Sequence, residues 1–328
     1  MKNFRGVKMG FSQSVHEELM VKAAYYYYEK DMTQTEIAQL LGVSRLTLGR
    51  LLKEARSSGI VRIEIANPRN LRHRLELEDR LCKNYGLSAS VVADYVPGSR
   101  QDRAEKVAVE ASKFFSRTVK SGMKISLAWG KTLSLMVDAL PIDKSITSLE
   151  VMTLMGGAGT TETYIQPERL AADLLSKYSG SGYVINAPFF CSSPEVCKGL
   201  KEERTVSEVL RRSADSDLTF VGIGEKPNLQ FNYWARHMYD QATMKRIIDS
   251  GAVGDICGTY INADGVPCCP DISARLVNID IETLKAHKKV IAIAAGPNKL
   301  ESIYAAISGG YIDVLITDTE TAEELFRI

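Results

Sequence analysis

The stretch from Thr33 to Ile65 constrains the fold more than any other part of the chain, because two short helical patterns flank a single glycine. Thr33 is followed three residues later by Glu36, the spacing of a capping box, which predicts the start of a helix. Gly42 predicts the end of that helix, since glycine adopts the left-handed conformation at little cost. Ser44 is a favourable N-cap for a second helix. The apolar residues of this second helix recur at helical spacing, at Leu48, Leu51, Leu52 and Ala55.

This pattern predicts a helix-turn-helix. The second helix leaves polar side chains on its outer face near the N-terminal half, the part of a recognition helix that reaches base edges in the major groove. Arginine can bind guanine through two hydrogen bonds, and serine or threonine can bind several bases. Arg56 and Arg62 are expected to hold phosphates, which position a protein without specifying sequence. The expected contacts to operator DNA are Gln34, Ser44, Arg45, Thr47, Arg50, Arg56 and Arg62.

A strand is expected directly after the second helix. Gly59 ends the helical pattern, and Val61, Ile63 and Ile65 then alternate with charged residues. A strand at this place would form the wing of a winged helix-turn-helix.

An ordinary helical hairpin with a solvated charged face is the alternative, because two helices joined by a glycine turn are common. The charges favour a nucleic-acid partner. Five basic residues and one acid, Glu54, lie between Ser44 and Arg62. The first 65 residues hold 10 Lys or Arg against 7 Asp or Glu, a net excess of 3. The whole chain has 41 basic and 40 acidic residues, so any affinity for nucleic acid must come from a local patch.

The composition is that of a globular protein of two or more domains. The chain has 328 residues, of which 45% are hydrophobic and 25% charged. No apolar run approaches 18 residues, so no membrane span is expected, and the N-terminus lacks the apolar core of a signal peptide. The six cysteines show no CxxC spacing and have no histidine nearby, so we expect reduced thiols, no metal site, no cofactor and a cytoplasmic location.

The predicted fold class is α/β. Residues 1–14 are expected to be disordered, 15–66 to form the winged helix-turn-helix domain, and 67–86 to be a linker and tethering helix that begins near Pro68. In residues 87–328 apolar strands alternate with amphipathic helices, which is typical of a parallel, Rossmann-like sheet with right-handed crossovers. Such sheets bind ligands outside the carboxyl ends of their strands.

Three glycine-containing turns follow predicted strands at that edge. Each permits a close backbone approach, and a helix N-terminus that follows such a turn binds anions. None matches GxGxxG or GxxxxGK[ST], so neither a dinucleotide fingerprint nor a Walker loop is present. Plain strand-to-helix turns are the alternative. Together the turns indicate a pocket for a small, anionic, hydroxyl-rich ligand. The turn residues expected to contact this effector are Gly130, Lys131, Thr132, Gly156, Gly157 and Gly224.

Asp255 and Lys299 are expected at the same edge. A carboxylate accepts hydrogen bonds from sugar hydroxyls, and an ammonium group pairs with phosphate. The alternatives are a strand-end cap for Asp255 and a surface lysine for Lys299. A strand is expected from Asp255 to Asn262, with Asp264-Gly265 turning it into a hairpin.

These motifs resemble the SorC/DeoR family of bacterial transcriptional regulators over about residues 15–328. The family combines an N-terminal helix-turn-helix with a sugar-binding domain related to sugar-phosphate isomerases. It implies a cytoplasmic homodimer or homotetramer in which a phosphorylated sugar controls operator binding. Met155 stands where some members carry a lysine, so no covalent imine to the sugar is expected, and Gly49 stands where many carry Ser or Thr. The resemblance is carried by Tyr26-Tyr27, Thr33–Ala38, Gly42–Arg45, Gly59–Val61, Gly251–Ile256, Ala295-Gly296, Lys299, Gly309–Leu315, Thr317-Asp318 and Thr321-Ala322.

The preferred hypothesis is a DNA-binding regulator of a carbohydrate-utilisation operon, whose residues 87–328 form a sugar-phosphate-binding effector and oligomerisation domain. The alternative is a sugar-phosphate isomerase or deaminase with an accessory helical domain. Such an enzyme needs a base near a carbon-bound proton, and Glu162, Glu225 and Asp264 are the candidates. No obvious acid–base pair stands at the strand ends, so we expect no enzymatic activity. A structural interaction module is disfavoured by the anion-binding turns.

Overall fold

The computed structural model describes residues 13–63, 71–94, 99–157, 159, 165–228 and 238–328. The chain divides into two compact units, Met1–Pro68 and Arg69–Ile328. The disorder predicted for residues 1–14 concerns mainly residues 1–12, which lie outside the described residues.

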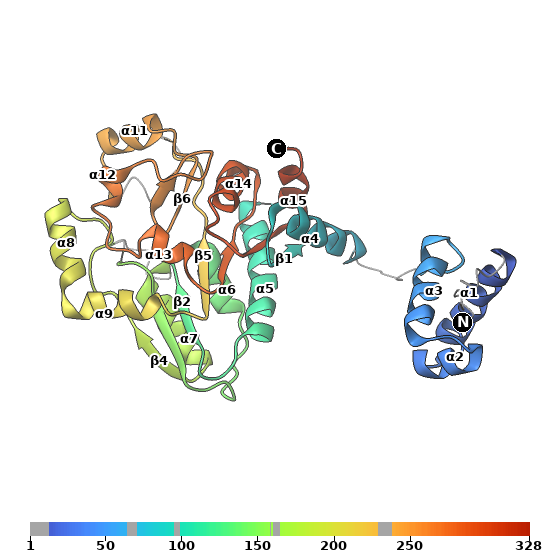
Figure 1. The fold of residues 1–328 in the computed structure, drawn as a ribbon. Coiled ribbons are helices and arrows are strands. Elements are labelled where there is room, and N and C mark those ends of the chain that lie inside the picture. Colours follow the sequence, from blue (N-terminus) through green and yellow to red (C-terminus); the bar gives the residue numbers. More distant parts are fainter. Residues whose placement is uncertain (1–12, 64–70, 95–98, 158, 160–164, 229–237) are drawn as a thin grey trace, which may run out of the picture. The chain divides into compact units, whose positions relative to one another are not determined.

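The first unit consists of helices α1 (Gln13–Tyr28), α2 (Gln34–Leu41) and α3 (Arg45–Ser57) (Figure 1). The capping box at Thr33 is confirmed: its side chain accepts from the Glu36 N–H, and the Glu36 carboxylate accepts from the Thr33 N–H. Gly42 ends α2 with φ 64°, and the Ser44 hydroxyl caps α3. The buried core of this unit is Ala23, Ile37, Ala38, Leu48, Leu51 and Leu52.

The wing predicted after α3 is wrong for Val61 and Ile63, which are not in a strand; Ile65 lies outside the described residues. The N–H of Val61 donates to the carbonyl of Ala55 at 2.9 Å, so the chain folds back onto the last turn of α3 instead of extending. Ile63 is 55% exposed. A strand needs a second strand to pair with, and none is present among the described residues of this unit. The alternation of apolar and charged residues is therefore not enough to form a strand here.

The second unit is built on a seven-stranded sheet of order β1-β9-β8-β5-β2-β3-β4, in which all neighbouring strands are parallel. The parallel Rossmann-like prediction is confirmed. Most of its strands are runs of buried residues, as expected for a sheet covered on both faces, whereas the edge strand Gly180–Tyr183 is largely exposed. The strands are β1 (Ala89–Ala93), β2 (Lys124–Leu127), β3 (Leu149–Thr153), β4 (Gly180–Tyr183), β5 (Leu218–Gly222), β8 (Val290–Ile293) and β9 (Val314–Asp318).

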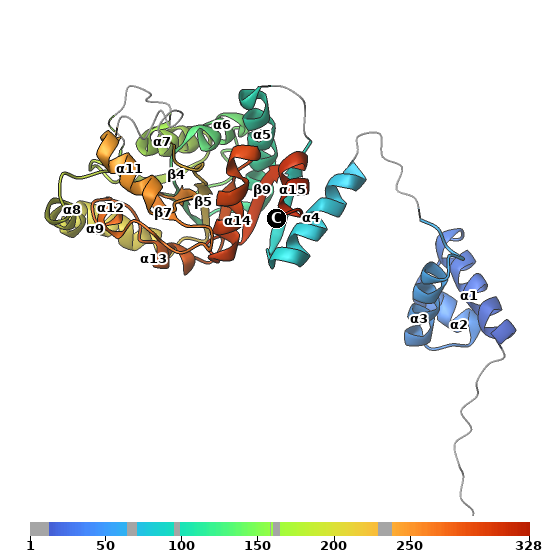
Figure 2. The same ribbon diagram turned by 90° about the horizontal axis from the view of Figure 1, so that it is seen from above.

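Helices cover both faces of this sheet. Figure 2 shows α5 (Arg100–Thr118), α6 (Lys131–Ala139) and α7 (Pro167–Lys177) on one face, and α4 (Leu71–Tyr85) and α14 (Leu300–Ser308) on the other. None of the described helices is both long enough and apolar enough to cross a membrane. The remaining helices are α8 (Pro194–Glu202), α9 (Arg204–Ser213), α11 (Gln241–Asp249), α12 (Pro270–Ser273), α13 (Ile281–Lys285), η2 (Pro297–Lys299) and α15 (Thr319–Leu325).

The single strand predicted from Asp255 to Asn262 is instead an antiparallel hairpin of β6 (Gly254–Ile256) and β7 (Thr259–Ile261). Cys257 and Gly258 form its two-residue turn, with φ of 49° and 84°. Two positive φ values match the twist that hairpin strands require. Cys-Gly is not a preferred turn pair, so the sequence pattern does not reveal this turn.

The sequence pattern left open whether helix α4 opens the second unit or only tethers it, and the structure places α4 within that unit. It packs against β1 and α15. Leu77 and Leu81 are buried in the main core, and the Glu78 carboxylate accepts from the Val92 N–H of β1 at 2.9 Å.

We expect Leu81→Ala to destabilise the second unit by about 2–5 kcal/mol, because it removes a fully buried side chain between α4 and the sheet. Leu75→Ala on the same helix is the matched control, since Leu75 is 47% exposed. Urea unfolding of both variants measures the difference. Equal midpoints for the two variants would show that α4 is only loosely attached.

Candidate functional site

The outer face of α3 carries Arg45, Arg50 and Arg56, and Arg62, the fourth charged residue predicted to contact DNA, follows the helix. Arg45, Arg50, Arg56 and Arg62 are all exposed, as is Ser44, while Thr47 and Gln34 are half-buried. The Ser44 side chain is engaged locally: its hydroxyl accepts from the Thr47 N–H at 3.1 Å and lies 2.8 Å from the Thr47 hydroxyl. This local bonding explains why α3 begins here. The arginine side chains are then the exposed groups of this surface that can reach a partner.

Glu54 is the acid that offsets this positive surface. Its carboxylate lies 2.6 Å from the His16 ring of α1 and 3.6 Å from Arg50. Arg45, Arg56 and Arg62 form no ion pair with any residue in the described parts of the chain. The surface therefore keeps a net positive charge, which attracts polyanions.

The cavity of the second unit lies at the carboxyl edge of the parallel sheet and measures about 610 Å³. It opens beside the neighbouring strands β2 and β5. The chain leaves β2 towards β3 on one side and leaves β5 towards β8 on the other. Such a switch in direction separates the connecting loops and creates a crevice where open parallel sheets bind ligands.

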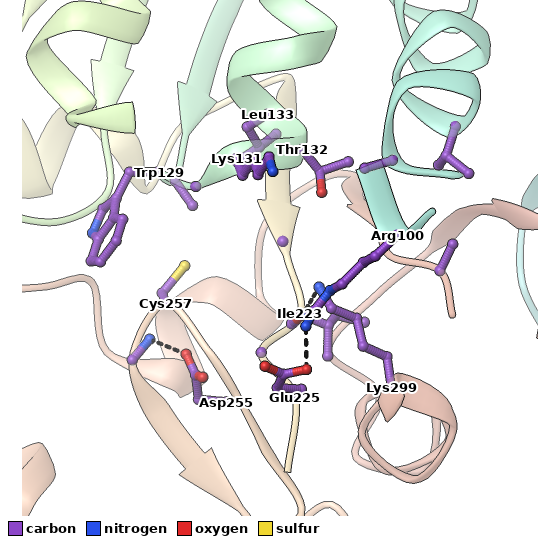
Figure 3. A pocket seen from close by; sticks show the side chains of 18 of the residues that line it. Arg100, Trp129, Lys131, Thr132, Leu133, Ile223, Glu225, Asp255, Cys257 and Lys299 are labelled. Carbon is purple, nitrogen blue, oxygen red and sulfur yellow. Dashed lines mark hydrogen bonds and ion pairs between the residues drawn. The ribbon is translucent and has the colours of Figure 1, made fainter. Parts of the chain in front are cut away.

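The N-terminus of α6 forms one wall of this cavity. Gly130 precedes the helix with φ 139°, a conformation that side chains rarely tolerate. No side chain caps α6, and its first turn holds no acid. Lys131 is exposed and Thr132 half-buried, and both line the cavity (Figure 3). Free N–H groups, a helix dipole and an ammonium group therefore converge on the same wall.

Lys299 and Asp255 line the opposite wall (Figure 3). The Lys299 ammonium donates to the carbonyl of Ile223 at 2.7 Å and forms no ion pair with a described carboxylate. Burial lowers the pKa of Lys299, and the charge of Arg100 lowers it further. Burial raises the pKa of the Asp255 carboxyl, against the opposing effect of a 3.0 Å hydrogen bond from the Gly258 N–H.

Gly224 lines the cavity because the chain passes very close to Asp255. Its N–H donates to the Asp255 carbonyl at 2.8 Å. A Cβ at Gly224 would lie 1.8 Å from the Asp255 carboxylate. The glycine thus leaves room for the Asp255 carboxylate, and it lines the cavity as the sequence pattern predicts.

Gly156 and Gly157 do not line the cavity, unlike the other predicted effector contacts. Their N–H groups donate to the carbonyls of Val277 and Ala187 at 2.9 and 3.0 Å. A Cβ at Gly156 would lie 2.3 Å from the Ala187 oxygen. These two glycines are therefore committed to packing against neighbouring loops, whereas Met155 before them lines the cavity.

Arg100 is a cavity residue that the sequence analysis missed. It begins α5, and its guanidinium donates to Glu225 at 2.8 Å across the cavity (Figure 3). The signal was present in the sequence, because Ser99 and Asp102 form a capping box that starts the helix at Arg100.

The chain matches known proteins over nearly its whole length. The family described as "Putative sugar-binding domain" matches residues 69–327. The transcriptional regulator LsrR of Escherichia coli is 31% identical over 314 residues, which is 95% of each chain. The crystal structure of the full-length sorbitol operon regulator SorC from Klebsiella pneumoniae superposes with a TM-score of 0.73 at 28% identity, over 94% of this chain and 98% of that one. The chain belongs to the SorC/DeoR family of transcriptional regulators.

Relatives that span this SorC/DeoR-family protein are regulators and not enzymes. The structure describes two of the three acids considered for an isomerase, and one of them, Glu225, lines the cavity. Glu225 is paired with Arg100, and Asp264 sits in an exposed turn; Glu162 lies outside the described residues. No group of three or more His, Cys, Asp or Glu in the described part of the chain could hold a metal ion.

We expect Gly224→Ala to lower the stability of this SorC/DeoR-family protein by about 1–3 kcal/mol or more, because its methyl group would displace the Asp255 carboxylate. Gly222→Ala is the matched control, since a Cβ there meets nothing within 4 Å. Thermal unfolding of both variants distinguishes them. A normal midpoint for Gly224→Ala would mean that Asp255 is not held where the structure places it.

Proposed function

We propose that this protein binds operator DNA of a carbohydrate-utilisation operon through α3 and that a phosphorylated sugar in the cavity controls that binding. The observation that carries the proposal is the Lys299 ammonium, a half-buried cation without a carboxylate partner among the described residues, facing a cavity with an uncapped helix N-terminus. Both groups favour an anion, and phosphate fits them best.

The remaining wall fits a sugar. Asp255 and Glu225 offer acceptors for hydroxyl groups, and Thr132 offers a donor and acceptor. Lys131 and Arg100 add positive charge near the opening. The names of two relatives, a sorbitol operon regulator and LsrR, are consistent with operon control. Gly130, Lys131, Thr132, Asp255 and Lys299 are therefore the proposed effector contacts.

Control would operate by linkage. A sugar phosphate that binds one arrangement of the protein more tightly shifts the population towards it, and the affinity for DNA changes by the same coupling free energy. Helix-turn-helix proteins usually bind as dimers, with recognition helices about one or more helical turns apart on the duplex. We therefore propose a homodimer or homotetramer that acts in the cytoplasm, where the operator is.

A gel shift tests the whole proposal. The probe is the DNA upstream of the operon that encodes this chain, with and without a panel of sugar phosphates. Binding that weakens with salt and changes with one sugar phosphate is the expected result. Turnover of that compound without DNA binding would instead identify an enzyme, and indifference to every fragment would refute operator binding.

Arg45→Ala should weaken specific DNA binding by about 1–3 kcal/mol, because this exposed arginine stands where a recognition helix reaches base edges. Lys22→Ala is the charge-matched control: it removes one positive charge from α1, where Lys22 is paired with Glu18. Fluorescence anisotropy at fixed salt measures both. Unchanged affinity for Arg45→Ala would exclude this residue as a base contact.

Lys299→Gln should weaken the response to the sugar phosphate about tenfold or more, since a charge-assisted hydrogen bond contributes about 1.5–3 kcal/mol. DNA binding without effector should be unchanged. Glutamine keeps a donor for the Ile223 carbonyl, so the wall is preserved. Lys226→Gln is the control, because Lys226 pairs with Glu301 and lies outside the cavity lining. Equal effector affinity of both variants in calorimetry would refute the phosphate site.

A further inference from the structure

Leu46 is the most exposed large hydrophobic residue in the described part of the chain, at 88%. It is the second residue of α3, two positions after the Ser44 cap. Single exposed leucines are common on protein surfaces. This one stands where a recognition helix meets base edges, so its position asks for a specific explanation.

Gly49 lies one turn further along the same helix and has no structural reason to be glycine. Its φ is not in the left-handed region, and a Cβ there would meet nothing within 4 Å. Glycine inside a helix lowers stability relative to alanine. The missing side chain therefore serves a contact made outside this unit.

Leu46, Arg50 and Lys53 follow one another at i, i+4 and i+7, so they share one face of α3. This face lies opposite the buried residues Leu48 and Ala55, and Gly49 leaves bare backbone between the exposed side chains. An apolar side chain and a gap thus lie beside two cations on this face. Another copy of the same surface would bring like charges together, so the partner that fits is a polyanion with an apolar group.

We propose that Leu46 contacts the 5-methyl group of a thymine in the operator and that Gly49 lets the α3 backbone approach the base edges. The thymine methyl is the apolar group that the major groove presents, and apolar side chains read it. Arg50 and Lys53 would hold the flanking phosphates. Leu46 thereby determines sequence specificity at one base pair of each half-site. This inference rests on operator binding by α3, as proposed above.

The test replaces thymine by uracil, which keeps the hydrogen-bonding edge and lacks only the methyl group. The probe is a duplex selected from a random pool by the full-length protein, with uracil introduced at one thymine at a time. At one position per half-site the wild-type protein should lose about fourfold in affinity, the effect of one buried methyl group. Leu46→Ala should bind the thymine duplex more weakly and show no further loss with uracil.

Two further variants serve as a control and as an independent test. Leu40→Ala, at a 55% exposed leucine of α2, should keep the full sensitivity to uracil. Gly49→Ala should raise the thermal midpoint and yet weaken DNA binding, a combination that a purely structural glycine would not produce.

Three outcomes overturn the inference. If uracil lowers the DNA affinity of wild type and of Leu46→Ala equally at every position, the methyl contact is excluded, although operator binding would stand. A change in sedimentation of Leu46→Ala without DNA assigns the leucine to self-association, again leaving operator binding intact. If no duplex is enriched from the pool, operator binding fails and the inference fails with it.

Discussion

Two opposite charges withdrawn from water, Lys299 and Asp255, line the cavity at the carboxyl edge of the sheet. Burial shifts the pKa of Lys299 down and that of Asp255 up, so both side chains are held at a cost. Backbone groups offset that cost: the Ile223 carbonyl accepts from Lys299, and the Gly258 N–H donates to Asp255. An ammonium has three donors and a carboxylate about four acceptor sites. Each side chain is therefore fixed by one bond and keeps capacity for a ligand.

The two units differ in how much of their structure is buried behind the functional side chains. The second unit buries its sheet under helices on both faces, so its charged side chains can be held rigidly at one edge. The first unit has a small core around Ile37, Leu48 and Leu51, and the rest of α3 is open to water. So small a unit has a narrow margin of stability, and residues of α3 that contribute nothing to the core are open to selection by a partner. Leu46 and Gly49 are both of this kind, which is why they point to an external partner.

Local interactions made much of the fold predictable. The boundaries of α2 and α3 follow from Thr33, Gly42 and Ser44, because each cap depends on residues within one turn. The alternation of strands and helices likewise predicted the parallel sheet. The errors concern contacts between distant residues. Whether Val61 and Ile63 form a strand depends on a partner strand, and whether α4 is a tether depends on its packing against β1; neither partner is visible in the local pattern.

The predicted site shows the same division, most clearly in its glycines. The three glycine-containing turns were expected to share one pocket for a small anionic ligand, yet the structure gives their glycines three different causes. Gly130 is needed for its backbone angle before α6, Gly156 for packing against the Ala187 carbonyl, and Gly224 for room beside the Asp255 carboxylate. A glycine after a strand thus indicates close packing of some kind and does not identify what is packed. Lys299 is more informative. Its ammonium group is taken out of water, and it forms no direct ion pair with a carboxylate among the described residues, so it favours an anion in the cavity.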